Sequence, residues 1–297
     1  MAEGSGGHLA GRVIAITGAG RGIGRSYALA MAREGARVVV NDLGTDLEGG
    51  DRSRGPAALV ADEILAGGGR AVANYADISF EDGARSIVED AEREYGRLDA
   101  VINNAAIEFR APLEKHSAAT FERVLSVNVT GSFNCMKAAM PLMLEQGAGA
   151  IVNTTSGAFW EGTEGVAAYS ASKAGAFSLT LSGHSELASR GISCNCIAPG
   201  ATRTRMVDAW ISQLGAKTDQ AEEEILAEWG IQTAENLAPL AVFLCSEAGS
   251  AISGNVFEVW GDRIQRIAAP VRGESIVREG ETWTFAALAE SLSRLAS

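Results

Sequence analysis

The sequence predicts an α/β fold: a seven-stranded, doubly wound parallel sheet with helices on both faces. Short apolar runs rich in Val, Ile and Ala alternate along the chain with longer segments whose apolar residues recur at helical spacing. Parallel strands need crossover connections, and this alternation supplies a helix for each of them. A length of 297 residues with 46% hydrophobic content is enough for one large domain.

Each element follows from a local pattern. The predicted strands are the apolar runs Val13–Thr17, Arg37–Asn41, Ala71–Tyr75, Ala100–Asn103, Ala150–Thr154, Ser193–Ile197 and Val256–Val259. The predicted helices are Ile23–Glu34, Ala57–Ala66, Phe80–Tyr95, Ala118–Leu144, Ala168–Ser189 and Ala234–Cys245. Two polar segments interrupt the alternation, a loop over Gly44–Pro56 and a partly helical insertion over Thr202–Gly230. Segments of this length are either lids or surface loops.

The chain ends are expected to lie outside the main domain, residues 11–262. We predict a flexible N-terminus over residues 1–10 and a C-terminal extension over residues 263–297. An amphipathic helix is predicted in the extension from residues that share one helical face: Phe285, Leu288, Ala289, Leu292 and Leu295. We favour a helix that caps its own domain over one that completes a neighbouring subunit's pocket.

Composition narrows the partners. The 25 Lys and Arg residues against 37 Asp and Glu residues give a net charge of −12, which repels nucleic acid and anionic membranes. We therefore expect no nucleic-acid or membrane partner, but small molecules or copies of the chain itself. The four cysteines lack zinc-site spacing and are predicted to be reduced core residues. With no spanning run and no signal-peptide pattern, a cytoplasmic location is expected.

The first strand leads into a glycine-rich turn, Thr17-Gly18-Ala19-Gly20-Arg21-Gly22-Ile23-Gly24, and then into a helix. Glycines here let the backbone approach a pyrophosphate, which the helix N-terminus stabilises. In this position the turn indicates a Rossmann-type dinucleotide site. Asp42, at the end of the second strand, can accept hydrogen bonds from the adenosine ribose and would repel a 2′-phosphate. NAD is therefore favoured over NADP, although Arg21, Arg52 and Arg54 are basic groups that could hold a phosphate.

A second constellation concerns proton transfer. Tyr169 and Lys173 are four residues apart, hence on one face of the predicted helix. A free tyrosine has a pKa of about 10 and needs nearby positive charge to act as a base at neutral pH. Ser156 follows the strand Ala150–Thr154, from where its hydroxyl could bind the same substrate oxygen. The three residues together favour acid/base chemistry on an alcohol or ketone.

Together with Asn103-Asn104-Ala105, Asn128 and Pro199-Gly200, these motifs resemble the classical short-chain dehydrogenase/reductase family over roughly residues 10–262. The resemblance implies a nicotinamide-dependent oxidoreductase. It implies that Tyr169 is the general acid/base and that Lys173 lowers its pKa and holds the nicotinamide ribose. Ser156 would orient the substrate oxygen, and Asn128 would anchor a water that links Lys173 to solvent.

The same resemblance implies a set of cofactor contacts. These fall to Gly18, Arg21, Gly22, Ile23 and Gly24 at the pyrophosphate, Asp42 at the adenosine ribose, Asp77 and Ile78 at the adenine, Asn103 and Ala105 at the neighbouring ribose, and Thr202 and Thr204 near the carboxamide. Two positions depart from the family pattern: Ala106 stands where a glycine is usual, and Asp262 replaces the second glycine after the last strand. Neither removes a reacting group.

The substrate is less constrained. Within the family, the stretch Val38–Gly44, the loop after it and Gly254–Val259 are similar to the hydroxyacyl-CoA dehydrogenase part of peroxisomal multifunctional enzymes, which implies a bulky secondary alcohol such as a 3-hydroxyacyl-CoA or a hydroxysteroid. Two alternatives stay open: a dehydrogenase of a small cyclic, terpenoid or aromatic alcohol, and a non-catalytic NAD-binding regulator. Candidate apolar pocket residues are Phe159, Trp160, Met206 and Trp210. The resemblance also implies a homodimer or homotetramer with Ala118–Leu144 and Ala168–Ser189 as interface helices.

Overall fold

A computed structural model describes residues 7–45, 54–218 and 220–268, together with Ser275, Val277, Thr284, Phe285 and Leu288. The strands are β1 (Val13–Thr17), β2 (Arg37–Asn41), β3 (Arg70–Asn74), β4 (Ala100–Asn103), β5 (Gly149–Thr154), β6 (Ile192–Pro199), β7 (Val256–Trp260) and β8 (Arg263–Ile267). The α-helices are α1 (Gly22–Arg33), α2 (Gly55–Ala66), α3 (Glu81–Tyr95), α4 (Ala118–Leu125), α5 (Gly131–Gln146), α6 (Ala158–Glu161), α7 (Ala167–Leu187), α8 (Arg205–Thr218), α9 (Glu222–Glu228) and α10 (Ala238–Cys245). A π-helical turn, η2 (Ser126–Thr130), and 3-10 turns at Leu113–Lys115, Ala188–Arg190 and Ala234–Leu237 complete the set.

The strands form one sheet in the order β3-β2-β1-β4-β5-β6-β7-β8. Strands β1 to β7 pair in parallel, which confirms the doubly wound fold. The predicted count of seven strands is wrong for the described residues, because β8 adds an antiparallel edge to β7. A tight turn with Gly261 at φ 61° joins the two strands. The polar sequence Arg-Ile-Gln-Arg-Ile of this exposed edge strand hid it from an apolar-run criterion.

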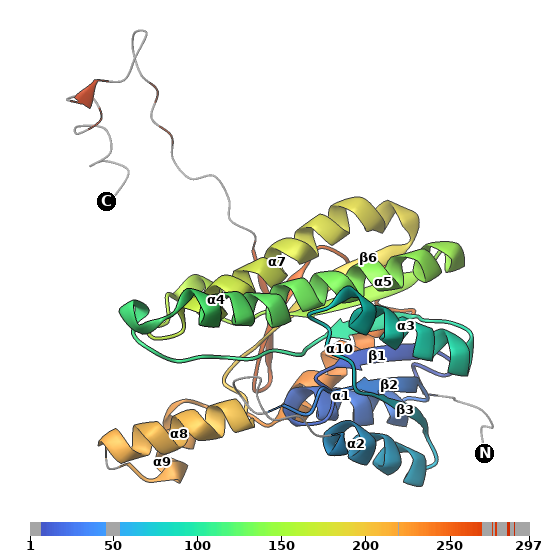
Figure 1. The fold of residues 1–297 in the computed structure, drawn as a ribbon, viewed down its shortest axis with the longest axis horizontal. Helices are drawn as coiled ribbons and strands as arrows, with labels where there is room; N and C mark the ends of the chain where they lie inside the picture. Colours follow the sequence, from blue (N-terminus) through green and yellow to red (C-terminus); the bar gives the residue numbers. More distant parts are fainter. Residues whose placement is uncertain are drawn as a thin grey trace. The chain divides into compact units, whose positions relative to one another are not determined.

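The core lies on both faces of the sheet, because alternate residues of a strand point to opposite sides. All of β1 is buried. Its Ile14 and Ile16 pack into a cluster with residues of α1, α2 and α10, whereas Val13 and Ala15 pack into a second cluster with residues of α3, α5 and α7. Figure 1 shows these two groups of helices on opposite sides of the strands. Burial on both faces explains why the central strands are continuous apolar runs.

The segment predicted as one helix over Ala118–Leu144 contains α4, the π-helical turn η2 and α5 in succession. The backbone stays helical across the junction, with Thr130 at φ −62° and ψ −40°. A π-turn inserts one extra residue into a helix and is often found at functional sites. This one contains Asn128.

The remaining departures concern the segments between and beyond the core. The insertion Thr202–Gly230 contains α8 and α9, as its partly helical pattern predicted, and the two helices lie side by side (Figure 1). Leu9, placed in the flexible N-terminus by the sequence, is fully buried and donates its N–H to the Glu34 carbonyl at 2.9 Å. The main domain is thus packed from Leu9 onward. Residues 46–53 of the predicted loop lie outside the described residues.

The chain divides into two units, Met1–Ile267 and Ala268–Ser297. The first residues of the predicted extension form β8 and belong to the first unit. Most of the predicted amphipathic helix in the second unit lies outside the described residues.

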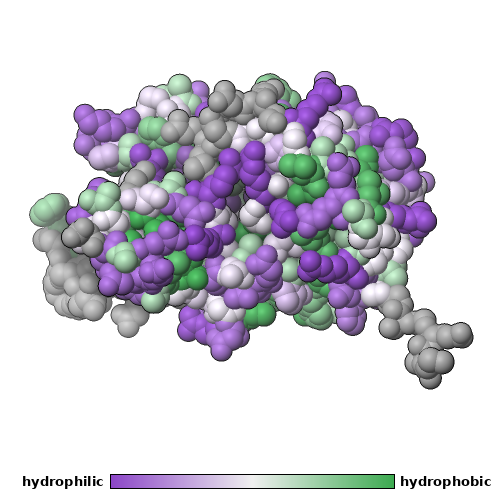
Figure 2. Space-filling view, turned by 90° about the horizontal axis from the view of Figure 1, so that it is seen from below, coloured by the Kyte–Doolittle hydropathy of each residue, from purple (hydrophilic) through white to green (hydrophobic). Residues whose placement is uncertain are grey.

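Further features of the described residues concern membranes, the surface, the cysteines and metal binding. No described helix is both long and apolar enough to cross a membrane. The face in Figure 2 intermixes hydrophilic and hydrophobic residues. All four cysteines are buried and free, and Cys194 and Cys196 pack into different core clusters. Among the described residues no cluster of three His, Cys, Asp or Glu side chains could hold a metal.

Candidate active site

A cavity of about 500 Å³ lies at the carboxyl ends of the central strands. Strands β1 and β4 are neighbours, but the chain continues from them toward opposite edges of the sheet. Doubly wound folds bind their ligands in the crevice between two such strands, at the carboxyl ends. The ends of these two strands are tied together, because the Thr17 hydroxyl accepts N–H hydrogen bonds from Asn104 and Ala105, each at 3.1 Å. These hydrogen bonds hold the two strand ends together beside the cavity.

The glycine-rich turn forms one wall of this cavity. Gly18 has φ 64°, and a Cβ added to it would lie 2.8 Å from the Cα of Ala105. Gly22, also at positive φ, begins α1, and no side chain caps that helix at Arg21. Such a turn leaves space for a pyrophosphate and presents the N-terminal N–H groups of a helix to it. The residues present thus fit a dinucleotide.

Asp42 lies at the end of β2 on the same cavity wall. Its carboxylate accepts N–H hydrogen bonds from Gly20 at 2.8 Å and Gly44 at 2.7 Å. Two guanidinium groups lie nearby, since Arg21 and Arg205 both donate to the Thr45 carbonyl, at 3.3 and 3.4 Å. This end of the cavity therefore holds a fixed carboxylate and two cations.

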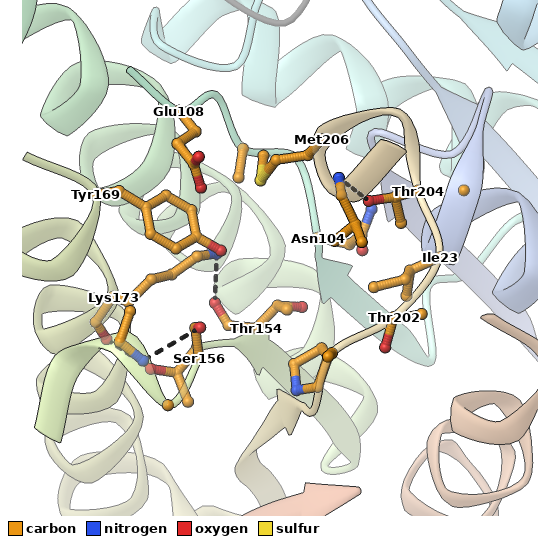
Figure 3. Close-up of a pocket in the computed structure, with 18 of the residues that line it drawn as sticks. Ile23, Asn104, Glu108, Thr154, Ser156, Tyr169, Lys173, Thr202, Thr204 and Met206 are labelled. Carbon is orange, nitrogen blue, oxygen red and sulfur yellow. Dashed lines mark hydrogen bonds between the residues drawn. The ribbon is translucent and has the colours of Figure 1, made fainter. Parts of the chain in front are cut away.

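Tyr169, Lys173 and Ser156 line the other end of the cavity (Figure 3). Helix α7 supplies the first two and the segment after β5 supplies the third. The Lys173 ammonium donates to the Thr154 carbonyl at 3.0 Å and lies 5.3 Å from the centre of the Tyr169 ring. The Ser156 hydroxyl accepts the Ala158 N–H at 3.3 Å. The structure thus brings together the three residues that the sequence singled out for proton transfer.

Burial controls the acidity of these groups. Removal from water raises the pKa of Tyr169 above its usual value, the Glu108 charge raises it further, and a hydrogen bond with Ser156 lowers it. Burial also lowers the pKa of Lys173 to about 8. Lys173 therefore remains mostly cationic at neutral pH, while Tyr169 is a neutral phenol, ready to donate a proton.

Asn128 is buried and does not line the cavity. Its carboxamide accepts the Ile107 N–H at 2.9 Å and donates to the Ile107 carbonyl at 3.0 Å and to the Ser172 hydroxyl at 2.9 Å. Ser172 in turn donates to the Tyr169 carbonyl at 2.7 Å. The Asn128 side chain therefore connects the segment after β4 to α7.

The other residues singled out by the sequence divide into three groups. Ile23, Thr202 and Thr204 line the main cavity, as do Gly18, Arg21, Gly22, Asp42 and Ala105. Asp77 and Ile78 line a smaller cavity of about 70 Å³ that shares Gly18, Asp42 and Ala105 with the first. Gly24 and Asn103 reach neither cavity: a Cβ on Gly24 would lie 2.2 Å from the Gly18 carbonyl oxygen, and Asn103 donates to Asn153 at 2.8 Å.

The apolar wall differs from the expected one. Met206 and Trp210 line the cavity, but Phe159 and Trp160 do not, because Phe159 stacks on Phe177 at 4.9 Å and Trp160 packs on Phe159.

Sequence reasoning missed several lining residues. These are Trp229, Trp260, Glu108 and Arg110. The signal for Glu108 and Arg110 was present, since both are charges close behind a buried strand end. No comparable signal marks the two tryptophans.

The short-chain dehydrogenase model matches residues 12–215, more than half of the chain. The chain belongs to this family. It shares 40% identity over 248 residues with the peroxisomal hydratase-dehydrogenase-epimerase of Saccharomyces cerevisiae, an alignment covering 84% of this chain but only 26% of the yeast protein. It is 37% identical over 246 residues to the 3-oxoacyl-acyl-carrier-protein reductase FabG of Staphylococcus aureus, covering 83% of this chain and 95% of that enzyme.

Solved structures of similar proteins support the same family assignment. A short chain dehydrogenase from Mycobacterium avium aligns with a TM-score of 0.83 and 38% identity, covering 98% of this chain and 96% of that one. A protein from Beutenbergia cavernae, assigned as an NAD(P)-dependent gluconate 5-dehydrogenase and holding NADP at low occupancy, aligns with a TM-score of 0.73 and 38% identity over 84% of this chain and 95% of that one. The chain is thus a short-chain dehydrogenase/reductase, an oxidoreductase that acts on hydroxyl or carbonyl groups in a family that uses NAD(P).

Proposed function

We propose that this chain interconverts a bulky secondary alcohol and its ketone with NAD(H), and that Tyr169 exchanges the proton. The observation that supports this most strongly is the meeting of Tyr169, Ser156 and Lys173 at one end of a cavity whose other end contains the glycine turn and Asp42. Gly18, Gly22 and Ile23 would hold the pyrophosphate and Asp42 the adenosine ribose, and Asp77 and Ile78 would lie at the adenine. Bound NAD would supply the hydride acceptor for oxidation and, in its reduced form, the hydride for reduction.

Proton transfer falls to the chain's own groups. In ketone reduction the Tyr169 phenol donates its proton to the carbonyl oxygen as that oxygen becomes an alcohol, and Ser156 donates a hydrogen bond to the same oxygen. In oxidation the phenolate accepts the alcohol proton. Lys173 supplies positive charge beside the phenol, and Asn128 holds α7 in place through Ser172.

Asp42 supports the choice of NAD. Its two carboxylate oxygens accept hydrogen bonds from Gly20 and Gly44, which hold the side chain in one orientation. A 2′-phosphate would therefore be repelled by a negative charge that does not move away from it. Arg21 and Arg205 are the groups that would favour NADP if Asp42 were neutralised.

The bulky substrate is supported by the likeness to the dehydrogenase-containing yeast protein, and we propose a 3-hydroxyacyl-CoA or a hydroxysteroid. A small cyclic or aromatic alcohol is the second candidate. It is favoured by the aromatic wall, in which Trp210 and Trp229 meet edge to face at 5.0 Å.

A substrate panel tests these proposals. Hydroxyacyl-CoAs, hydroxysteroids, and terpenoid and aromatic alcohols are offered with NAD and with NADP, and the absorbance of the reduced nicotinamide is followed. Turnover of the first two groups with NAD supports the proposal. Tight NADH binding without turnover of any alcohol or ketone would instead support a non-catalytic regulator.

We further propose a homodimer or homotetramer that uses α4, α5 and α7, since Phe133 on α5 is 46% exposed in the single chain. Small molecules are its proposed partners. Light scattering of the purified protein tests the assembly.

The four buried, free cysteines suit a reducing compartment such as the cytoplasm.

A further inference from the structure

Glu108 is a buried charge inside the substrate end of the cavity. Its side chain is 7% exposed, and it lines the same cavity as Tyr169. One carboxylate oxygen, Oε1, forms an ion pair with the Arg110 guanidinium. Among the described residues this is the single hydrogen-bond or ion-pair partner of Glu108.

The backbone next to Glu108 is held by hydrogen bonds. Asn128 holds both the N–H and the carbonyl of Ile107, the residue directly before Glu108. Figure 3 shows the carboxylate directed toward the Tyr169 ring, with Met206 across the cavity. The Glu108 charge raises the pKa of both Tyr169 and Lys173.

A buried carboxylate in the wall sets a requirement on whatever fills the cavity. A substrate that enters displaces water from the wall, and a carboxylate oxygen left without a donor in a dry site is costly. Burial raises the pKa of Glu108, whereas the Arg110 guanidinium favours the ionised form, in which the carboxylate can only accept hydrogen bonds. An apolar group or a carbonyl oxygen placed against it would therefore weaken binding.

We propose that Glu108 is a substrate-binding residue that accepts a hydrogen bond from a donor on the substrate, a second hydroxyl or an ammonium group, next to the reacting carbon. The inference rests on the proposed function and narrows its substrate class. A ring alcohol or steroid with a further hydroxyl group meets the requirement. A simple 3-hydroxyacyl thioester does not, because the functional group nearest its reacting carbon, one methylene away, is a thioester carbonyl that can only accept hydrogen bonds.

Binding to the NADH complex tests the proposal without turnover. Isothermal titration compares cyclohexanol, the cyclohexanediols and the aminocyclohexanols on the wild type and on Glu108→Leu. The wild type should bind a diol or an amino alcohol about ten- to a hundredfold more tightly than cyclohexanol, as expected for a hydrogen bond to a charged group. Glu108→Leu should remove that preference.

The controls separate a binding role from a structural one. Glu161→Gln removes another carboxylate of the same cavity and should leave the preference in place. If Glu108→Leu does not fold, Glu108→Gln retains an acceptor without charge and should weaken the preference for amino alcohols more than that for diols. A diol preference identifies a hydroxyl as the donor, and an amino-alcohol preference identifies an ammonium group.

Two results would overturn the inference: equal affinity of the wild type for all three ligand types, or a preference that survives in Glu108→Leu. Neither depends on Tyr169. Failure of the proposed function would appear instead as unimpaired turnover by Tyr169→Phe, so the two failures are distinguishable.

Discussion

Replacing Asn128 with alanine should destabilise the protein far more than its distance from the cavity suggests. Asn128 is 3% exposed and makes three hydrogen bonds, to the Ile107 N–H, the Ile107 carbonyl and the Ser172 hydroxyl. Each buried hydrogen bond contributes roughly 1 kcal/mol net, and a backbone group left buried without a partner costs more. Asn128→Ala should therefore lower the free energy of unfolding by about 3 kcal/mol.

A neighbouring residue provides the matched control. Asn134, on α5, is equally buried at 4% but makes one hydrogen bond, to the Ile78 carbonyl at 3.0 Å. Asn134→Ala should therefore cost only about 1 kcal/mol. Urea unfolding of both variants at one protein concentration, followed by circular dichroism, measures the difference.

Measurements of kcat give a second test of Asn128→Ala. Because Asn128 connects the segment of Glu108 to α7, its loss should reduce kcat as well as stability, whereas Asn134→Ala should leave kcat close to that of the wild type. An Asn128→Ala variant no less stable than Asn134→Ala would refute the role assigned to these three hydrogen bonds.

Three further predictions concern the cavity walls and Lys173. Gly18→Ala should lower the free energy of unfolding by about 2 kcal/mol and weaken NADH binding. The position has positive φ, and the new Cβ would meet the Ala105 backbone. A fluorescence titration that shows wild-type NADH affinity would contradict this prediction. Asp42→Ala should narrow the ratio of kcat/KM values for NAD and NADP, and a wild type that uses both cofactors equally well would refute the role of Asp42. Burial lowers the pKa of Lys173 from 10.5 to about 8. Between these two pH values the folded protein therefore binds fewer protons than the unfolded chain. The contribution of Lys173 to stability rises with pH over this range. Relative to Lys173→Met, the wild type should gain stability as pH increases from 8 to 10.5 in urea titrations, and a constant difference would show that Lys173 is not buried as described.

Much of the fold could be predicted from local patterns, and the exceptions have physical causes. The strands β1 and β2 match the predicted ranges because their central residues are apolar and buried on both faces of the sheet. Strand β8 was missed because an exposed edge strand needs no apolar run. The π-turn around Asn128 was missed because a single inserted residue leaves the helical periodicity on either side nearly unchanged.

The reacting groups could also be predicted, because fixed spacing on one helix places Tyr169 and Lys173 together. The residues of the cavity wall that would contact the substrate could not be predicted. Glu108 and Trp229 lie 121 positions apart in sequence yet line one cavity, and only the packing of the connecting segments determines that. The acidity of Tyr169 could not be predicted either, since it depends on burial, on the Glu108 charge and on the hydrogen bond with Ser156.

Single-turnover reduction of a ketone substrate by the NADH complex of Tyr169→Phe tests the central claim most directly. The substitution removes one hydroxyl and leaves the ring that packs in the cavity, so NADH affinity should remain within about twofold of the wild type. The rate of NADH oxidation should fall by at least about a hundredfold, the contribution expected of a positioned general acid. A variant that binds NADH normally and turns over at the wild-type rate would contradict the assignment of proton transfer to Tyr169.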